Sequence, residues 1–522
     1  MDTKSIILNG STLSIEDIAA IVENPNLQVR IAPSALAFAN KAKKFLDKEA
    51  RKKIIYGVNT GFGPMASHII GRNEIDMLQK NLIHGHSMGM GAPLPERYVL
   101  AAMVVRLNTL VKGYSGVSRE LLKQIQTFIN KRIIPVVPEH GAVGTSGDLV
   151  QLAHIALAFI GDGEVFYHGR RQPTAKVLNE LRIAPYVLKP KEGLSLINGT
   201  SMMTGIAALH CTDAQRLISI SIRNGAMALE SIGAFDDGIS SRLHELRPHH
   251  GQRVVARTLR SLLSSSRLLK RREKFQKTFK VTGTLHQIPE SVQEVYSLRC
   301  IPQVVGPVLD ILHKVSGEIT IEMNAVTDNP VVDWKNKTFI HGGNFHGDYI
   351  AAAVDQLKIS LVKLTMLSER RANFFLNQKI NLFFPPFMNL KKPGLTMGLQ
   401  GLQFVATSTT SQSQTLAFPQ NVHSIPTNGD NQDIVSMGTD AALIAARVIE
   451  NAYIVFAVEL LTLLQTVDFL GEESNYCRSS REMFAEFRKI FPALIDDREA
   501  YGELQKVLDA LKKGEPLNIE WK

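Results

Sequence analysis

Long helical periods of apolar residues fill the chain after Asn198 and limit the folds that it can adopt. At ~1.5 Å per residue they predict rods of roughly 20 to 50 Å, which bury their apolar stripes by packing side by side. The periods run from about Ser201 to Phe235, Ile301 to Met323, Asp348 to Leu376, Leu402 to Leu416 and Thr439 to Leu470. Because few segments elsewhere resemble strands, the sequence predicts an all-α fold built on a central helix bundle.

The most apolar segment, Ala441 to Leu470, is long enough to cross a bilayer. It is interrupted by charged residues at intervals that hydrocarbon would not tolerate, namely Arg447, Glu450, Glu459 and Asp468. We therefore expect a buried bundle helix and no membrane partner. The first ten residues, MDTKSIILNG, lack the charged and apolar regions of a secretory signal.

Shorter helices are expected before Asn198. Ser14 predicts a capped helix, and Pro33 is typical of a helix start. Further helices are expected from about Glu74 to His84, Glu96 to Lys112 and Ser118 to Asn130, with another ending at Ile160. Alternating residues predict two small hairpins, one at Glu164 to Tyr167 with its turn just after, and one at Val331 to Ile340.

A glycine-rich loop from Glu139 to Leu152, EHGAVGTSGDLVQL, is unusual for a helix or a strand. It is either a plain turn before a helix or a site of backbone cyclisation. In the second case the nitrogen of Gly147 joins the carbonyl carbon of Thr145. Loss of two waters, one of them from Ser146, then leaves an electron-poor imidazolone. Only glycine admits that nitrogen without a Cβ clash.

Seven short segments occur in one order along the chain. They are YGVNTGFG from Tyr56, GTSGDL from Gly144, LINGTSMMTG from Leu196, YSLRCIPQ from Tyr296, TDNP from Thr327, GGNFHG from Gly342 and DNQDIVSMG from Asp430. This order resembles the ammonia-lyase and aminomutase family, which forms 4-methylideneimidazol-5-one (MIO) by the cyclisation above. The chain departs from the family at Thr145, where alanine is usual. Closure uses only the carbonyl of this residue and should survive; the alternative is a non-catalytic helical scaffold in which the β-branched side chain blocks it.

The resemblance implies an N-terminal MIO domain at residues 1–198 and a bundle with C-terminal helices at 199–522. It also implies a homotetramer in which each active site takes residues from three subunits. The MIO of Thr145-Ser146-Gly147 would be the electrophile that makes the substrate amine a leaving group. Tyr56 would be the base that removes the β-proton. Without the surrounding segment, Tyr56 would be taken for an ordinary buried tyrosine.

Arg299 is the best candidate to bind the substrate carboxylate, because a planar guanidinium matches two carboxylate oxygens. Its apolar neighbours, Leu298 and Cys300, favour a buried position. The resemblance implies further roles for five residues. They are Asn198 beside the MIO oxygen, Tyr296 near the amine, Gln303 in the same shell, Asn329 with the carboxylate and Phe345 against the ring. For the asparagines, turn chemistry is the alternative explanation.

The pair Gly85-His86 aligns with the positions that read the substrate side chain in the family. Histidine in the second place is typical of the histidine enzymes. Where those enzymes have glutamates near the imidazole, this chain has Gln412 and Gln432, and a neutral amide suits a neutral aromatic ring better. The sequence therefore predicts L-tyrosine to p-coumarate, unless His86 only packs or caps its helix. Histidine and phenylalanine ammonia-lyases and an aminomutase are the alternatives.

Other functions are not favoured. The net charge of +10 is concentrated between Arg267 and Lys280, with few aromatic residues to stack on bases, so no nucleic-acid partner is expected. No phosphate-binding glycine motif is present, and His244-Glu245 lacks the spacing of a zinc protease, so no metal is expected. Three widely spaced cysteines fit a reducing cytoplasm. Ser146 lacks the frame of a hydrolase nucleophile.

Overall fold

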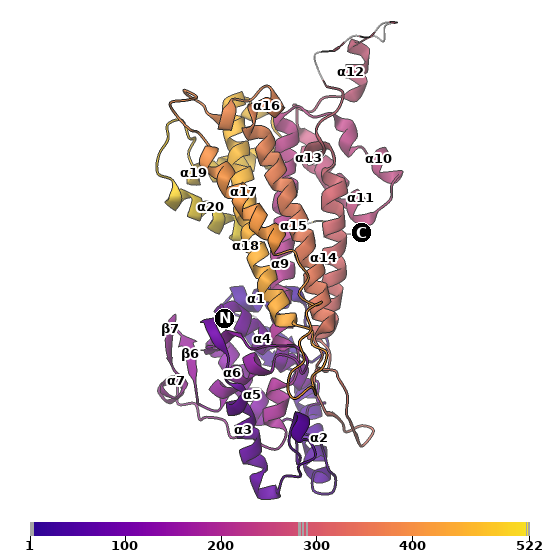
Figure 1. Cartoon of the computed structure of the whole chain (residues 1–522), viewed down its shortest axis with the longest axis vertical. Helices are drawn as coiled ribbons and strands as arrows, with labels where there is room; N and C mark the ends of the chain where they lie inside the picture. Colours follow the sequence, from indigo (N-terminus) through magenta and orange to yellow (C-terminus); the bar gives the residue numbers. More distant parts are fainter. Residues whose placement is uncertain are drawn as a thin grey trace. The chain divides into compact units, whose positions relative to one another are not determined.

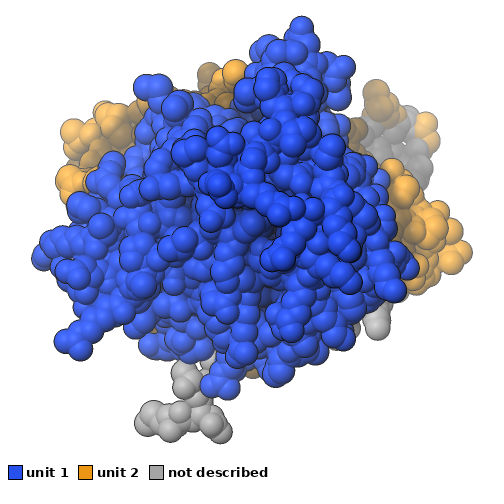
Figure 2. All heavy atoms as spheres, turned by 90° about the horizontal axis from the view of Figure 1, so that it is seen from below, with its two compact units in different colours: residues 1–212, 315–355, 419–445 blue, residues 213–314, 356–418, 446–522 orange. Residues whose placement is uncertain are grey.

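The computed structural model describes residues 5–279, 283, 285, 287–288, 291–517 and 519. Lys280 of the basic segment lies outside them. The chain divides into two compact units: unit 1 comprises residues 1–212, 315–355 and 419–445, and unit 2 comprises 213–314, 356–418 and 446–522 (Figure 2). These units do not follow the predicted domain boundary at residue 198, which stays a prediction.

Unit 1 contains the N-terminal helices (Figure 1). They are α1 (Ile15–Glu23), α2 (Pro33–Glu49), α3 (Ile75–His86), α4 (Glu96–Val111), α5 (Arg119–Lys131), α6 (Leu149–Phe159), α7 (Thr174–Glu180) and α8 (Glu192–Ile197). The predicted starts are confirmed, because Ser14 forms a capping box on α1 and Ser118 caps α5. The core of the unit includes α4, which is buried from Tyr98 to Val111.

Short strands complete unit 1. The two predicted hairpins are confirmed as β6 (Glu164–Tyr167) with β7 (Arg170–Pro173) and β8 (Val331–Asp333) with β9 (Thr338–Ile340). Three further pairings were not predicted. They are β1 (Ser5–Leu8) parallel to β2 (Gln28–Ile31), β3 (Met90–Pro93) with β5 (Pro138–His140), and β4 (Ile134–Pro135) with β6.

Four of the long helices predicted after Asn198 contribute residues to both units. They are α9 (Ser201–Ser231), α14 (Ile301–Met323), α15 (Asp348–Leu376) and α18 (Gly438–Leu470). The fifth is α17 (Gln400–Thr415) in unit 2. Unit 2 also holds α10 (Ser241–Glu245), α11 (His250–Leu262), α12 (Arg272–Thr278), α13 (Tyr296–Arg299), α16 (Gln378–Asn381), α19 (Arg478–Ile490) and α20 (Tyr501–Lys513). The all-α prediction is therefore confirmed.

Polar and apolar contacts join the helices of unit 2 into a bundle. Asn224 on α9 and Ser368 on α15 both donate to the carboxylate of Glu459 on α18, at 3.1 and 2.6 Å. Ala406 on α17 packs with Val455 on α18. Among the described residues, α18 is the one helix long and apolar enough to cross a membrane, and 67% of its most apolar window is buried, as expected for a bundle helix.

Candidate active site

The glycine-rich loop lies in unit 1 and is held by close backbone contacts. Gly144 and Gly147 have positive φ angles of +76° and +73°, a region that favours glycine. A Cβ on Gly147 would lie 2.0 Å from the carbonyl oxygen of Gly199, and one on Gly144 would lie 2.1 Å from Ser436 Oγ. No side chain fits at either position, so the loop is more constrained than an ordinary turn.

Both oxygen atoms of Ser146 accept hydrogen bonds. Asn198 Nδ2 donates to the Ser146 carbonyl oxygen at 3.2 Å, and Gln432 Nε2 donates to Ser146 Oγ at 3.1 Å. The hydroxyl of Thr145 donates to the carbonyl of Ile434 at 3.4 Å. Asn198 Oδ1 is buried and has no hydrogen-bond partner among the described residues, which leaves a free acceptor beside Ser146. The structure thus brings Asn198 and Gln432 together with the predicted triplet.

Asp148 ties this loop to the start of α9, a role that the sequence pattern does not predict. Its Oδ2 accepts the backbone N–H groups of Met202 and Met203 at 2.8 and 3.0 Å, and Oδ1 accepts from the Thr439 hydroxyl. A carboxylate is well placed against the unpaired N–H groups of a helix N-terminus. Burial raises the pKa of Asp148 to about 6, while these hydrogen bonds and the charge of Arg106 act to lower it.

Tyr56, the predicted base, is half-buried within its own glycine-rich segment. Its hydroxyl oxygen accepts the backbone N–H of Gly63 at 3.0 Å, and its ring meets that of Phe62 edge to face, with centroids 6.3 Å apart. Gly57 follows at a φ of +65°, where a Cβ would lie 2.4 Å from a methyl carbon of Leu194. The glycines therefore place the phenol with little freedom.

Three other predicted residues, Asn329, Phe345 and His86, also lie in unit 1. Asn329 Oδ1 accepts the N–H of Gly342 at 3.0 Å. Phe345 is half-buried, two residues before Gly347, whose N–H donates to the carbonyl of Gly144 at 3.0 Å. His86 ends α3 and bonds through Nδ1 to the Leu82 carbonyl at 2.8 Å, which agrees with the capping alternative. Because a carbonyl only accepts, Nδ1 carries a proton, and Nε2 of the neutral ring is an acceptor.

The remaining four predicted residues belong to unit 2. Tyr296 begins α13 with 71% of its surface exposed, and the guanidinium of Arg299 lies 4.5 Å from its ring centroid. Arg299 is half-buried. Its Nε and Gln303 Oε1 are buried without a hydrogen-bond partner among the described residues. Gln412 is exposed on α17, and its Oε1 accepts from Asn451 Nδ2 at 3.0 Å.

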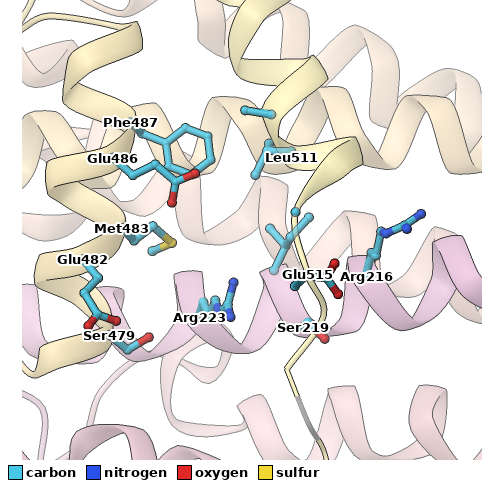
Figure 3. Close-up of a pocket in the computed structure, with 13 residues that line it drawn as sticks. Arg216, Ser219, Arg223, Ser479, Glu482, Met483, Glu486, Phe487, Leu511 and Glu515 are labelled. Carbon is cyan, nitrogen blue, oxygen red and sulfur yellow. The ribbon is translucent and has the colours of Figure 1, made fainter. Parts of the chain in front are cut away.

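Two other features of the described chain are distinct from these residues. Across the described ranges, no group of three or more His, Cys, Asp or Glu side chains is placed to hold a metal ion. A cavity of about 170 Å³ in unit 2 is lined by charged residues that include Arg216, Arg223, Glu482 and Glu486 (Figure 3). None of the predicted site residues is in its lining.

The helical fold and the constrained serine-glycine loop define a class of enzyme that comparisons with known proteins identify. The aromatic amino acid lyase family model matches residues 13–489. The chain therefore belongs to the aromatic amino acid lyase family, and the family prediction is confirmed.

Individual relatives cover nearly the whole chain. A histidine ammonia-lyase from Geobacillus sp. (strain WCH70) is 37% identical over 516 residues, which cover 99% of this chain and 97% of that protein. The tyrosine aminomutase structure from Streptomyces globisporus has a TM-score of 0.95 at 34% identity, covering 99% and 100% of the two chains. The histidine ammonia-lyase structure from Trypanosoma cruzi has a TM-score of 0.88 at 31% identity, covering 98% and 94%.

Proposed function

We propose that Thr145, Ser146 and Gly147 form MIO and that the chain eliminates ammonia from an aromatic L-amino acid. The observation that carries this proposal is a pair of hydrogen bonds to Ser146. Its carbonyl oxygen accepts from Asn198 and its hydroxyl oxygen accepts from Gln432. In maturation the nitrogen of Gly147 bonds to the carbonyl carbon of Thr145 and one water leaves. Ser146 loses Oγ and its Cα hydrogen as the second water.

The residues fit this ring. The Thr145 hydroxyl is turned to the Ile434 carbonyl, which agrees with a side chain outside the ring. Gly147 occupies a position where a Cβ would overlap the carbonyl of Gly199. The Gln432 amide donates to the oxygen that leaves, and an N–H donor stabilises negative charge that develops there.

The MIO would supply an electrophile that binds the substrate amine and improves it as a leaving group. The chain's own residues do the rest. Tyr56 removes the β-proton, Arg299 pairs with the carboxylate, and Asn329 bonds the same group. Asn198 lies beside the ring oxygen and Tyr296 near the amine, while Gln303 and Phe345 complete the site.

Histidine is the first candidate substrate. The tyrosine preference predicted from Gln412 and Gln432 is not supported by the relatives, because those at 37% and 38% identity are histidine ammonia-lyases. His86 is compatible with histidine, since its Nε2 can accept the N–H of a substrate imidazole.

Tyrosine is the second candidate, favoured by three observations. A phenol hydroxyl can also donate to His86 Nε2, and the Gln432 amide cannot give an imidazole the charge-assisted bond of a carboxylate. The Streptomyces globisporus tyrosine aminomutase shares 34% identity with this chain. Phenylalanine has no side-chain donor for His86, so it should be the weakest of the three substrates.

Intact-mass measurement tests the proposal directly. A matured chain is lighter than its sequence by two waters, and an unmodified mass would overturn the proposal. Parallel assays of histidine, tyrosine and phenylalanine, followed by the ultraviolet absorbance of the unsaturated acids, rank the substrates. Release of a β-amino acid would identify an aminomutase.

We also propose a homotetramer and a cytoplasmic location. Support for the first is the exposed apolar surface of α17, where Phe404 is 63% exposed. Sedimentation that shows a stable, active monomer would contradict it. Support for the second is that none of Cys211, Cys300 and Cys477, all among the described residues, forms a disulfide. Cell fractionation tests it.

A further inference from the structure

Two buried cations in unit 1 bind the segments that carry Asn198 and Asn329. Arg106 on α4 is 3% exposed, and Lys191, which precedes α8, has no exposed surface. Neither cation has a role in the chemistry proposed above. A buried charge is costly unless it is paired and hydrogen-bonded, so the partners of these two side chains indicate what they hold in place.

Lys191 joins the two segments through its ammonium group. Nζ donates to Asp328 Oδ2 at 2.9 Å and to Ser195 Oγ at 3.0 Å. The other oxygen of Asp328 accepts the backbone N–H of Asn329 at 2.7 Å. Lys191 therefore contacts α8 just before Asn198 and, through one carboxylate, the backbone of Asn329.

Arg106 joins the same two segments through their backbones. Its Nη1 donates to the carbonyl of Thr327 at 3.0 Å, and its Nη2 donates to the carbonyl of Asn198 at 2.8 Å and also to that of Ser195. A Cβ on Gly199 would lie 2.3 Å from Arg106 Nη1. The guanidinium thus occupies a space that the chain leaves open by using glycine.

The arrangement is expensive to build, which argues against simple packing. Burial lowers the pKa of Arg106 to about 10 and also lowers that of Lys191, although the charge of Asp328 opposes both shifts. Lys191 also adopts a left-handed backbone conformation, with a φ of +72°. Buried ion pairs contribute little net stability compared with apolar side chains of the same size. What the arrangement provides is a defined position for Asn198 and Asn329.

We propose that Lys191, Asp328 and Arg106 are positioning residues that set Asn198 and Asn329 for the bound amino acid. The inference rests on the proposed function, because it uses the roles given there to the asparagines. Asn329 positions the carboxylate and Asn198 bonds Ser146, so disturbing the network affects substrate binding and ring formation through these two side chains. Neither cation itself touches substrate.

The test separates positioning from stability with the double variant Lys191→Met/Asp328→Asn. Each single change strands a buried charge and lowers the melting temperature, whereas the double change removes both charges and should recover most of it. Activity should not recover. Per chain that has lost two waters, kcat/KM should fall by about tenfold to a hundredfold, chiefly through KM, because a ~1 Å misplacement of a binding group costs about that much.

A matched control is the double variant Arg371→Met/Glu459→Gln, which removes a second fully buried ion pair, in unit 2. It should change stability yet keep the wild-type kcat/KM per matured chain. A folded Lys191→Met/Asp328→Asn protein that fails to mature, while the control matures, also supports the proposal through Asn198. Wild-type kinetics in the Lys191→Met/Asp328→Asn protein, or an equal fall in the control, would overturn it.

Asp328→Glu covers the case in which the double variant does not fold. It keeps the charge and moves the carboxylate by one methylene, so the melting temperature should change little while KM rises. An unchanged KM would count against the proposal. Wild-type protein serves as the reference for the proposed function itself, since its intact mass reports ring formation independently of these variants.

Discussion

The buried ion pairs of the two units differ in the structural elements that they connect. In unit 1, Lys191 and Asp328 lie outside the long helices, and Asp328 accepts the backbone N–H of Asn329 in an irregular segment. In unit 2, Arg371 on α15 and Glu459 on α18 pair across two long helices, and Asn224 joins them from α9. Polar groups therefore shape loops in one unit and join helices in the other, although all four charged side chains are fully buried.

The glycines of the two units also differ in what they allow: loop contacts in unit 1 and helix packing in unit 2. In unit 1, Gly144 and Gly147 combine positive φ angles with close contacts to other segments. In unit 2, Gly251 on α11 allows close helix packing, since a Cβ there would lie 2.2 Å from the carbonyl of Gly306 on α14. Substitution of Gly144 or Gly147 should therefore change chemistry, and substitution of Gly251 should change stability.

The largest effect is expected for Ser146→Ala. Without Oγ the second water cannot leave, so the variant should not show the loss of two waters. Its activity should drop to background, with the melting temperature little changed. Mass spectrometry and the product absorbance measure both. The matched unit 2 variant is Ser264→Ala, which removes an exposed hydroxyl that bonds the Ser261 carbonyl at 2.9 Å. Ser264→Ala should mature and turn over normally; residual MIO-dependent turnover in Ser146→Ala would break the comparison.

Gly147→Ala should also block maturation, because the new methyl group would lie 2.0 Å from the carbonyl of Gly199. Gly169→Ala is its control: the φ of Gly169 is +70°, yet nothing lies within 4 Å of the added Cβ. The control should lose only about 1–2 kcal/mol from its left-handed backbone and should mature fully. Intact mass and thermal melting separate the two outcomes. Full maturation of Gly147→Ala would show that the contact with Gly199 is unimportant.

Glu459→Gln, in unit 2, should lower stability without affecting maturation. It leaves the Arg371 guanidinium buried without its carboxylate, and breaking a buried pair costs about 3–5 kcal/mol. Thermal melting should therefore show a clear loss of stability, while mass spectrometry shows the same loss of two waters as in the wild type. A stable protein that fails to mature would contradict the division of roles between the units.

Asp148→Asn should give a smaller, pH-dependent effect. A carboxyl whose pKa is raised by folding stabilises the fold below its unfolded pKa and loses that contribution as pH rises through the folded value. For Asp148 these values are 3.8 and about 6. At ~1.36 kcal/mol per pKa unit, the wild type should lose up to about 3 kcal/mol relative to the variant across this range. Melting temperatures at a series of pH values should show the difference between the two proteins narrowing as pH rises; a constant difference would contradict the assignment.

Sequence patterns predicted the helices well because the determinants are local. Ser14 caps α1, Pro33 starts α2, and the predicted limits of α14 and α15 are those observed. The parallel pairing of β1 with β2 was missed because four-residue strands have too little periodicity to predict a partner.

The candidate site was only partly predictable. Asn198 and Gln432 were found through family resemblance, not through spacing, since their contacts with Ser146 join residues 52 and 286 positions apart. Arg106 was missed for the same reason: its bond to Thr327 spans 221 positions, and an arginine inside an apolar helix predicts no partner. Physical patterns of a few residues do not encode contacts over such separations.

The distance along the chain between Ser146 and Gln432 also sets a minimum time during synthesis before the two residues can meet. The ribosome adds roughly 5–20 residues per second, so the 286 residues that separate them take roughly 15 to 60 s to make. Throughout that interval the serine hydroxyl lacks its amide partner. Asp148 likewise lacks the Thr439 hydroxyl, which is 291 residues downstream. A nascent chain released before these residues emerge carries the whole glycine-rich loop yet lacks the side chains of Gln432 and Thr439 that bind it.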